Sequence, residues 1–319
     1  MARVFVSRWM PGGALDRLAA AHETDVWEER TAPPRDELLA RVREVDGLLS
    51  MLTDAVDPEL MDAATRLRAI SNYAVGVDNV DLAAATERGL PVGHTPGVLT
   101  DSTADLAVGL MLGIARRLAE GEAFVRRGEW VTWVPDLMLG RDLHGATVGI
   151  VGFGRIGQAV ARRLEGFGCE ILHTARSTGL PLEELLRRSD FVTLHCPLTP
   201  ETHGLIGAEA LAQMRPTAYL VNTARGPIVD TAALAEALSA GGIAGAALDV
   251  TDPEPLPGDH PLLAAPGLVV VPHVGSATHA TRGRMADIAV DNLLAALAGE
   301  RMPHCVNPEV YERATPRSP

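Results

Sequence analysis

The stretch "TVGIVGFGRIGQAVARRL", residues 147–164, joins an apolar strand pattern to a glycine-rich turn and a helical pattern. Gly152, Gly154 and Gly157 have the spacing GxGxxG: the first glycine permits a tight turn, the second lets the backbone approach a pyrophosphate, and the third brings helix and strand together. The start of the helix adds N–H groups and a positive dipole end for phosphates. The stretch therefore predicts a dinucleotide-binding loop, with a purely structural glycine turn as the alternative.

Short apolar runs alternate with helical patterns on both sides of this stretch, which is typical of parallel βαβ sheets. The expected strands of the second series cover residues 147–151, 170–174, 191–195, 218–222, 245–249 and 268–272. A first series comprises expected strands at 3–7, 47–51 and 68–72, with helices near 12–20, 35–43 and 58–65. We therefore predict an α/β protein with two Rossmann-like, doubly wound parallel-sheet domains.

The order of these series predicts a discontinuous layout. The last helical pattern, about 278–299, leads into a tail too short to form a domain, so we expect it to cross back to the first domain. The substrate domain would then comprise 1–99 plus 286–319, with a dinucleotide-binding domain, 100–285, inserted. Between the two series runs a predicted helix, 100–128, whose glycines at 109 and 113 flatten one face. That face would pack within the chain or form the contact of a homodimer.

Composition excludes several classes of function. The 28 basic and 41 acidic residues give a formal charge of −13, which argues against binding to nucleic acid or an anionic membrane. No apolar run reaches the roughly 18 residues of a membrane span, and the first residues begin a strand rather than a signal peptide. The cysteines, Cys169, Cys196 and Cys305, have neither CxxC pairing nor zinc-like spacing. We expect a cytoplasmic protein without a metal.

The end of the expected strand 170–174 indicates the cofactor. About twenty residues after the first glycine, a carboxylate would bind the ribose 2′-hydroxyl of NAD, but here the sequence reads "HTARST", residues 173–178. A carboxylate would repel a 2′-phosphate, whereas the guanidinium of Arg176 would pair with it. The stretch favours NADPH. The alternative is an exposed arginine in a protein that uses NADH.

Three further stretches follow strands of the second series, where an open parallel sheet binds its ligands. They are "NTARGPIVD" (222–230), "LDVTDPEP" (248–255) and "PHVGSAT" (272–278). Each contains one candidate for polar chemistry: Arg225, Glu254 and His273. Any one alone would more often be a surface residue than a catalyst, but three at one sheet edge beside a nicotinamide pocket predict a catalytic site.

With these motifs the chain resembles the D-isomer-specific 2-hydroxyacid dehydrogenases, and within them the glyoxylate/hydroxypyruvate reductases. The matching stretches run in order along nearly the whole chain: "SNYAVGVDNVDL" (71–82), "HTPGVLTDSTADLAVGLML" (94–112), "GFGRIGQAVARR" (152–163) and the three stretches above. Trp133, Pro135, Leu139 and Gly140 resemble the glyoxylate reductase branch. The resemblance implies NAD(P)H-dependent reduction of a small 2-keto acid to the D-2-hydroxy acid.

The resemblance also implies roles for residues. Arg225 would bind the substrate carboxylate and polarise the adjacent carbonyl, and His273 would give a proton to the developing alkoxide as general acid. Glu254, hydrogen-bonded to the imidazole, would favour its charged form. The amides around Val75 and Gly76 would hold the carboxylate, with Leu52 covering it; a turn glycine and a core leucine are the alternatives.

On the cofactor side, the resemblance implies a further set of contacts. It places Thr103 and Asp249 near the nicotinamide, Arg155 and Ile156 over the pyrophosphate, Pro197 on the adenine side, Thr223 at the nicotinamide ribose, Gly275 at the carboxamide, and adds Thr202 to the cofactor-binding set. Asp249 could instead cap its strand. His195 is expected to cap a strand end rather than bind a metal.

One departure bears on the cofactor. Relatives usually have a longer connection after the position of Arg176, often with a second basic residue, so NADH use stays open. Two other functions also stay open: phosphoglycerate dehydrogenase or another D-2-hydroxyacid dehydrogenase, and a dinucleotide-sensing binding protein like the corepressors of this fold.

Overall fold

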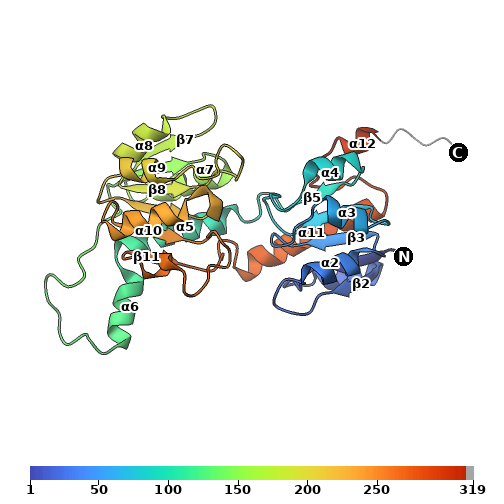
Figure 1. The fold of residues 1–319 in the computed structure, drawn as a ribbon, viewed down its shortest axis with the longest axis horizontal. Helices are drawn as coiled ribbons and strands as arrows, with labels where there is room; N and C mark the ends of the chain where they lie inside the picture. The colour runs from blue at the N-terminus through green and yellow to red at the C-terminus, as the bar shows by residue number, and fades with distance from the viewer. Residues whose placement is uncertain (314–319) are drawn as a thin grey trace. The chain divides into compact units, whose positions relative to one another are not determined.

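The computed structural model describes residues 1–313, which form two compact units (Figure 1). Unit 1 contains Met1–Leu99 and the chain from Ala277 on, and unit 2 contains Thr100–Ser276. The chain thus returns to unit 1 at Ala277, whereas the sequence placed the return at 286. The return comes early because the whole of helix α11 (His279–Leu297) packs on the sheet of unit 1.

Unit 1 contains a five-stranded, fully parallel sheet in the order β2-β1-β3-β4-β5. Its strands are β1 (Arg3–Val6), β2 (Glu23–Val26), β3 (Gly47–Ser50), β4 (Ala69–Asn72) and β5 (Val92–Gly93). The central strands β3 and β4 are buried along their whole length, as expected for a parallel sheet covered on both faces. The sequence patterns missed β2 and β5, because β2 is a polar edge strand and β5 has two residues.

Helices cover both faces of this sheet. They are α1 (Ala14–Ala21), α2 (Arg35–Val42), α3 (Pro58–Ala63), α4 (Leu82–Glu87) and α11; the short α12 (Val310–Arg313) follows near the end of the described chain. Side chains of α1 and α11 form one apolar cluster with Val4 and Leu49, and those of α2, α3 and α4 form another with Phe5 and Leu48. Gly47 brings α11 close, since a Cβ there would lie 3.1 Å from Leu293 Cδ1.

Unit 2 contains a six-stranded parallel sheet in the order β11-β10-β9-β8-β6-β7. Its strands are β6 (Thr147–Val151), β7 (Glu170–Thr174), β8 (Phe191–Leu194), β9 (Tyr219–Asn222), β10 (Gly245–Leu248) and β11 (Leu268–Val270). From β6 the chain first adds β7 on one side and then β8 on the other, so the topological switch lies between β6 and β8. Parallel sheets bind ligands at the carboxyl ends of the strands at such a point.

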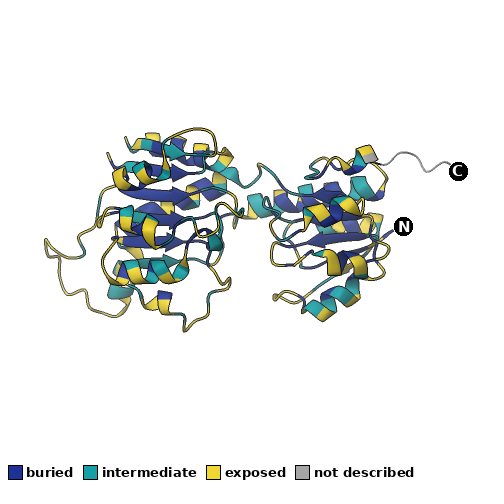
Figure 2. Cartoon of the chain, turned by 45° about the horizontal axis from the view of Figure 1, so that its top comes forward, coloured by how far each residue is buried: buried dark blue, intermediate teal, exposed yellow. Residues whose placement is uncertain are grey.

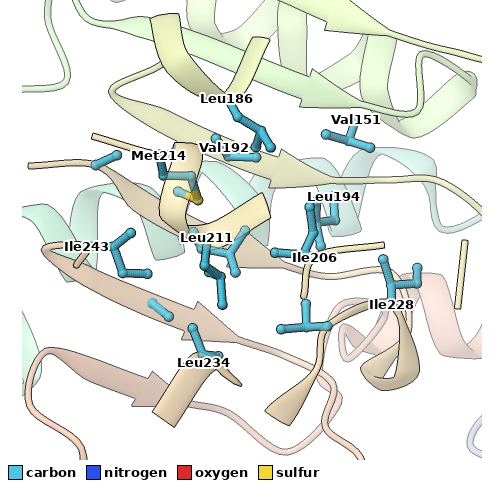
Figure 3. Close-up of a cluster of buried hydrophobic side chains, with 14 of the residues drawn as sticks. Val151, Leu186, Val192, Leu194, Ile206, Leu211, Met214, Ile228, Leu234 and Ile243 are labelled. Carbon is cyan, nitrogen blue, oxygen red and sulfur yellow. The ribbon is translucent and has the colours of Figure 1, made fainter. Parts of the chain in front are cut away.

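The helices of unit 2 lie on both faces of its sheet. They are α5 (Thr100–Ala115), α7 (Arg155–Glu165), α8 (Leu182–Arg188), α9 (Ala208–Gln213) and α10 (Thr231–Ser239), with 3-10 turns at Gly226–Ile228 and Pro261–Ala264, while α6 (Leu118–Arg126) contacts α5 and has no buried residue. Helices α5 and α7 share one apolar cluster, and α8, α9 and α10 share the other. Figure 3 shows part of the second cluster, which contains Leu186, Leu211 and Leu234 from the helices and Val192 and Leu194 from β8. In both units the central strands are buried, and exposure concentrates on helices, loops and edge strands (Figure 2). The prediction of two doubly wound parallel-sheet domains is confirmed.

The helix predicted over 100–128 is two helices, α5 and α6. The chain breaks at Arg117, whose φ of 53° is left-handed, and the Ala115 carbonyl accepts a hydrogen bond from Arg141 N (2.9 Å) instead of continuing the helix. A Cβ at Gly140 would lie 2.2 Å from that carbonyl oxygen, so the returning loop needs glycine to reach it. Within residues 1–313, no helix is both long and apolar enough to cross a membrane.

Candidate active site

The turn after β6 has the shape that its glycines require. Gly152 has a φ of 93°, and a Cβ there would lie 2.4 Å from Cys196 N, just after β8. A Cβ at Gly157 would lie 2.2 Å from Gly152 O, so this glycine brings α7 against the turn. At Gly154 a Cβ would meet no atom within 4 Å. Gly152 and Gly157 therefore allow close packing of the chain, whereas Gly154 leaves open space beside the backbone.

Helix α7 begins directly at this open space. Gly154 is its N-cap residue, and Arg155 and Ile156 form its first turn. The first N–H groups of a helix have no acceptor within the helix, and they carry the positive end of its dipole. The turn therefore has the geometry and charge to bind the phosphates of a dinucleotide, and its residues fit such a cofactor.

Strand β7 leads into a tight turn that contains Arg176. Ala175 N donates to Thr178 O (2.9 Å), Leu180 N donates to His173 O (2.9 Å), and Gly179 closes the turn with a φ of 94°. Arg176 is exposed, and within residues 1–313 no carboxylate pairs with it. The turn thus presents a cation after the strand next to β6, where a dinucleotide fold binds the adenine ribose.

His273 and Glu254 form a close pair. Nδ1 of His273 lies 2.6 Å from Glu254 Oε1, although the residues are 19 positions apart. The strands β10 and β11, which precede them, are neighbours and parallel, so their carboxyl ends lie at one edge. Burial acts to raise the pKa of the Glu254 carboxyl, but the hydrogen bond and charge of His273 outweigh burial and lower it. The carboxylate therefore stays ionised beside the imidazole.

Asp249 fixes the segment that carries His273. The Asp249 carbonyl accepts from His273 N (2.9 Å), while its carboxylate accepts from Val274 N (2.6 Å) and Gly275 N (2.9 Å). These bonds hold His273 in the left-handed region, with a φ of 51°. Burial raises the pKa of the Asp249 carboxyl, while the Val274 amide acts to lower it. In this structure the carboxylate of Asp249 caps the loop after β11.

Arg225 follows the next strand of the same edge, β9. The side chain of Asn222 supports its loop, since Nδ2 donates to Arg225 O (2.8 Å) and Oδ1 accepts from Ala224 N (3.0 Å). The charge of Arg225 also acts to lower the pKa of Glu254, although less than His273 does. Arg225, Glu254 and His273 therefore follow three adjacent parallel strands, β9, β10 and β11.

Other predicted cofactor residues of unit 2 have local partners. Thr103 Oγ1 donates to Gly275 O (3.3 Å), which ties α5 to the loop after β11. Thr202 Oγ1 donates to Pro197 O (2.7 Å) and accepts from Thr199 N (2.8 Å), so this hydroxyl shapes the loop after β8. Pro197 itself is exposed.

The ring of His195 lies between two threonines. Its Nε2 is 2.9 Å from Thr193 Oγ1, and its Nδ1 is 3.4 Å from Thr223 Oγ1. Burial lowers the pKa of His195 to about 3, so the ring is neutral at physiological pH. Within residues 1–313 no three His, Cys, Asp or Glu side chains cluster as a metal site would require.

The predicted substrate residues of unit 1 follow two adjacent strands, β3 and β4. Leu52 lies in the loop after β3 with 38% of its surface exposed, which is high for a leucine that only fills a core. Val75 and Gly76 lie in the loop after β4 and are half-buried.

The sequence patterns missed several residues that support these loops. Asn222 and Asn72 were counted only as parts of expected strands and matching stretches, and Asn79 only as part of a matching stretch. An asparagine at the carboxyl end of a buried strand is the signal that could have identified Asn72 and Asn222, because such a side chain has loop amides and carbonyls within reach. Asn79 carries no comparable local signal.

Comparison with known proteins gives a consistent result. The family model described as "D-isomer specific 2-hydroxyacid dehydrogenase, NAD binding domain" matches residues 108–275. A glyoxylate reductase of Korarchaeum cryptofilum is 48% identical to this chain, with 98% of each chain covered. A glyoxylate reductase of Thermococcus litoralis is 47% identical, with 98% of this chain and 99% of the relative covered.

Two solved structures resemble the whole chain. A protein from Thermus thermophilus is 53% identical with a TM-score of 0.92, covering 95% of this chain and 99% of its own. An NADPH-dependent glyoxylate/hydroxypyruvate reductase from Sinorhizobium meliloti, in complex with NADP and malonate, is 35% identical with a TM-score of 0.84. That comparison covers 96% of this chain and 97% of the reductase.

Proposed function

The chain belongs to the D-isomer-specific 2-hydroxyacid dehydrogenases, and on that premise we propose that it reduces glyoxylate or hydroxypyruvate to the D-2-hydroxy acid. Membership of this family makes it an NAD(P)-dependent oxidoreductase that acts on CH–OH groups. The observation that carries the proposal is the 2.6 Å contact between His273 Nδ1 and Glu254 Oε1, on the same sheet as the phosphate-binding turn. Similarity to glyoxylate reductases supports the choice of substrate.

The residues of unit 2 divide the chemistry among them. With Nδ1 bonded to Glu254, the Nε2 atom of His273 is the one that would give its proton to the substrate oxygen. The Glu254 carboxylate stabilises the protonated ring, and Arg225 polarises the substrate carbonyl. The cofactor supplies the hydride when it is bound. The fixed loop geometry imposed by Asp249 holds the imidazole ready, which reduces the reorganisation that the reaction requires.

We assign the cofactor to the turn after β6 and the residues around it. The pyrophosphate would be held by Gly152, Gly154, Gly157, Arg155 and Ile156. The rest of the cofactor would lie along Thr103, Pro197, Thr202, Thr223, Asp249 and Gly275. The exposed guanidinium of Arg176 favours NADPH, because it would pair with a 2′-phosphate that a carboxylate would repel. On the substrate side, the amides of Val75 and Gly76 would bind the carboxylate, with Leu52 beside them.

The protein is also proposed to be a homodimer. Helix α6 exposes Leu118 (61% exposed) and Val125 (53%), and the loop after it exposes Val131 (90%), Trp133 (76%) and Leu139 (69%). Exposed apolar surface of this extent in a folded unit indicates a protein–protein contact. A second copy of the chain is the partner that the predicted contact over 100–128 requires.

Steady-state kinetics test the proposed reaction. Glyoxylate, hydroxypyruvate, pyruvate and 3-phosphohydroxypyruvate would each be assayed with NADPH and NADH. We expect the highest kcat/KM for glyoxylate or hydroxypyruvate with NADPH. Preference for 3-phosphohydroxypyruvate would instead identify a phosphoglycerate dehydrogenase. No turnover of any keto acid, together with tight NADPH binding, would identify a dinucleotide-sensing binding protein.

A further inference from the structure

In the loop after β4 of unit 1, three consecutive backbone carbonyls each accept a hydrogen bond from another part of the unit. Ala74 O accepts from Thr95 N (2.8 Å), Val75 O lies 2.9 Å from His94 Nδ1, and Gly76 O accepts from Asn72 Nδ2 (3.1 Å). Since a carbonyl can only accept, the His94 ring must carry its proton on Nδ1. The peptides that begin at Ala74, Val75 and Gly76 are therefore each held by their carbonyl oxygen.

The planar peptide bond converts these contacts into a direction for the N–H groups. In a trans peptide the carbonyl of one residue and the N–H of the next point in opposite directions. Because Ala74 O is bound by Thr95 N and Val75 O by His94 Nδ1, the N–H groups of Val75 and Gly76 point away from Thr95 and His94. Neither N–H donates to an acceptor among residues 1–313. The loop thus presents backbone donors where the proposed function requires a carboxylate to bind.

The side chain of Asn79 joins this loop to the loop after β3. Asn79 Nδ2 donates to Met51 O (3.0 Å) and to Asp54 O (2.9 Å), both in the loop after β3 that contains Leu52. Asn79 Oδ1 in turn accepts from Asn72 Nδ2 (3.0 Å), the same group that holds Gly76 O. Asn79 therefore links the two loops through its side chain, beside a backbone bridge in which Val56 N donates to Asn79 O (2.9 Å) and Asp81 N donates to Val56 O (2.9 Å).

The other end of the network is anchored in the sheet. Ser50 Oγ donates to Asn72 Oδ1 (3.0 Å), and both residues are fully buried. This bond fixes the orientation of the Asn72 amide, so its Nδ2 faces Gly76 O and Asn79. In the loop after β3, the buried carboxyl of Asp54 accepts from Met51 N (2.7 Å) and from Ser7 Oγ. The loop after β3 is thereby held both by the carboxyl of Asp54 and by the side chain of Asn79.

We propose that Asn79 and Asn72, oriented by Ser50, are positioning residues that hold the loops after β3 and β4 as one carboxylate-binding frame for the substrate. The proposal rests on the proposed function in that the ligand is a 2-keto acid. The frame acts on the bound carboxylate, which the reaction does not change. Its loss should therefore raise KM with little change in kcat.

Two variants and a matched control test this role. Asn79→Ala removes both bonds to the loop after β3, and we expect KM for glyoxylate to rise about tenfold, with kcat within about twofold of wild type. Ser50→Ala only releases the orientation of Asn72, so a smaller rise of about threefold is expected. This second variant replaces one small buried side chain by another, so it tests the proposal even if Asn79→Ala does not fold. The Kd of NADPH should be unchanged in both.

Asn307→Ala is the control because its side chain makes a similar set of bonds elsewhere in unit 1. Its Nδ2 donates to Thr86 Oγ1 (3.0 Å) and Leu90 O (3.0 Å), and its Oδ1 accepts from Val92 N (2.8 Å). We expect Asn307→Ala to lower the unfolding temperature while KM stays at the wild-type value. An equal rise of KM in the control, or no rise in Asn79→Ala and Ser50→Ala, would overturn the proposal.

Binding of oxamate, a non-reducible analogue of a 2-keto acid, separates this proposal from the proposed function. Calorimetry on the NADPH-loaded protein should show oxamate bound about tenfold more weakly by Asn79→Ala than by wild type and Asn307→Ala. If the wild type binds oxamate in this pattern yet reduces no keto acid, the frame is supported and the proposed reaction fails. If the wild type binds no oxamate at all, the frame is rejected too.

Discussion

At the scale of single residues, the contact between Glu254 and His273 determines the proposed proton transfer. Replacing Glu254 by Gln keeps the shape of the side chain but removes the negative charge that stabilises the protonated imidazole. We expect kcat for glyoxylate to fall about a hundredfold at neutral pH, within the range of general acid catalysis. NADPH binding, measured by fluorescence titration, should be unchanged. A variant with wild-type kcat would remove Glu254 from the proposed mechanism.

The same carboxyl gives a prediction about stability and pH. Because the folded-state pKa of Glu254 lies below its ordinary value, its contribution to stability is present above that ordinary value and is lost as the pH falls through the folded pKa. The advantage in unfolding temperature of wild type over Glu254→Gln should therefore shrink between pH 7 and pH 3. Thermal unfolding of both proteins across this range measures the difference; an advantage that grows towards low pH would contradict the lowered pKa.

Arg176 determines the proposed choice of cofactor. Arg176→Asp replaces a partner of the 2′-phosphate by a group that repels it and that can bind a ribose hydroxyl. We expect the ratio of kcat/KM for NADPH to that for NADH to fall by about tenfold to a hundredfold. Arg187→Asp makes the same change of charge on the exposed side of α8 and should leave the ratio unaltered. An unchanged ratio in Arg176→Asp would mean that this arginine does not select the cofactor.

At the scale of elements, different glycines of the β6–α7 turn serve the packing of the fold and the proposed binding of the cofactor. Gly157→Ala would place a Cβ 2.2 Å from Gly152 O, so helix and turn must move apart. Such overpacking costs about 1–3 kcal/mol, and we expect the unfolding temperature to drop by about 5 °C. Calorimetric melting of the protein without cofactor would show it, and a wild-type melting temperature would contradict the close approach.

Gly154→Ala is the matched variant in the same turn, because its Cβ meets no atom within 4 Å. We expect a wild-type unfolding temperature but an NADPH affinity reduced by about tenfold or more, which corresponds to ~1.4 kcal/mol. The added methyl group would occupy space that the proposed pyrophosphate needs. Unchanged affinity would place the phosphates elsewhere.

Helices α5 and α6 show why an element boundary was missed. Apolar residues continue at helical spacing past Ala115, so the pattern alone predicts one helix. The break depends on Arg141 and Gly140, which are distant in sequence and bond or closely approach the Ala115 carbonyl. Arg117 then adopts a left-handed conformation that its residue type does not favour.

At the scale of the whole molecule, the apolar surface of α6 and its following loop predicts the assembly. Sedimentation velocity should give a dimer at micromolar concentration, and Val131→Glu with Trp133→Glu should give a monomer because two charges would enter the contact. Trp9→Glu is the control, since Trp9 is also exposed (64%) but lies in unit 1. A wild-type monomer, or a double variant that remains dimeric, would contradict the proposed homodimer.

Much of the fold and of the candidate site could be predicted from local patterns in the sequence. The buried strands β6, β8, β9 and β10, the GxGxxG turn and the polar stretches after β9, β10 and β11 all carry local signals, because burial on both faces and a tight turn each restrict the residue types that fit. The edge strands β2 and β5 carry weaker signals, since half-exposed or very short strands place few demands on their residues.

Local patterns were enough to predict the two doubly wound sheets and the family, because those depend on residue types at short spacing. The tertiary structure alone decided which distant groups meet: Glu254 with His273 across 19 residues, Asp249 with the loop after β11, and Asn79 with the loop after β3. It also decided that α11 packs on the sheet of unit 1. The physical reason is that a side chain's hydrogen-bond partner depends on where the sheet brings other strand ends, and no local pattern contains that information.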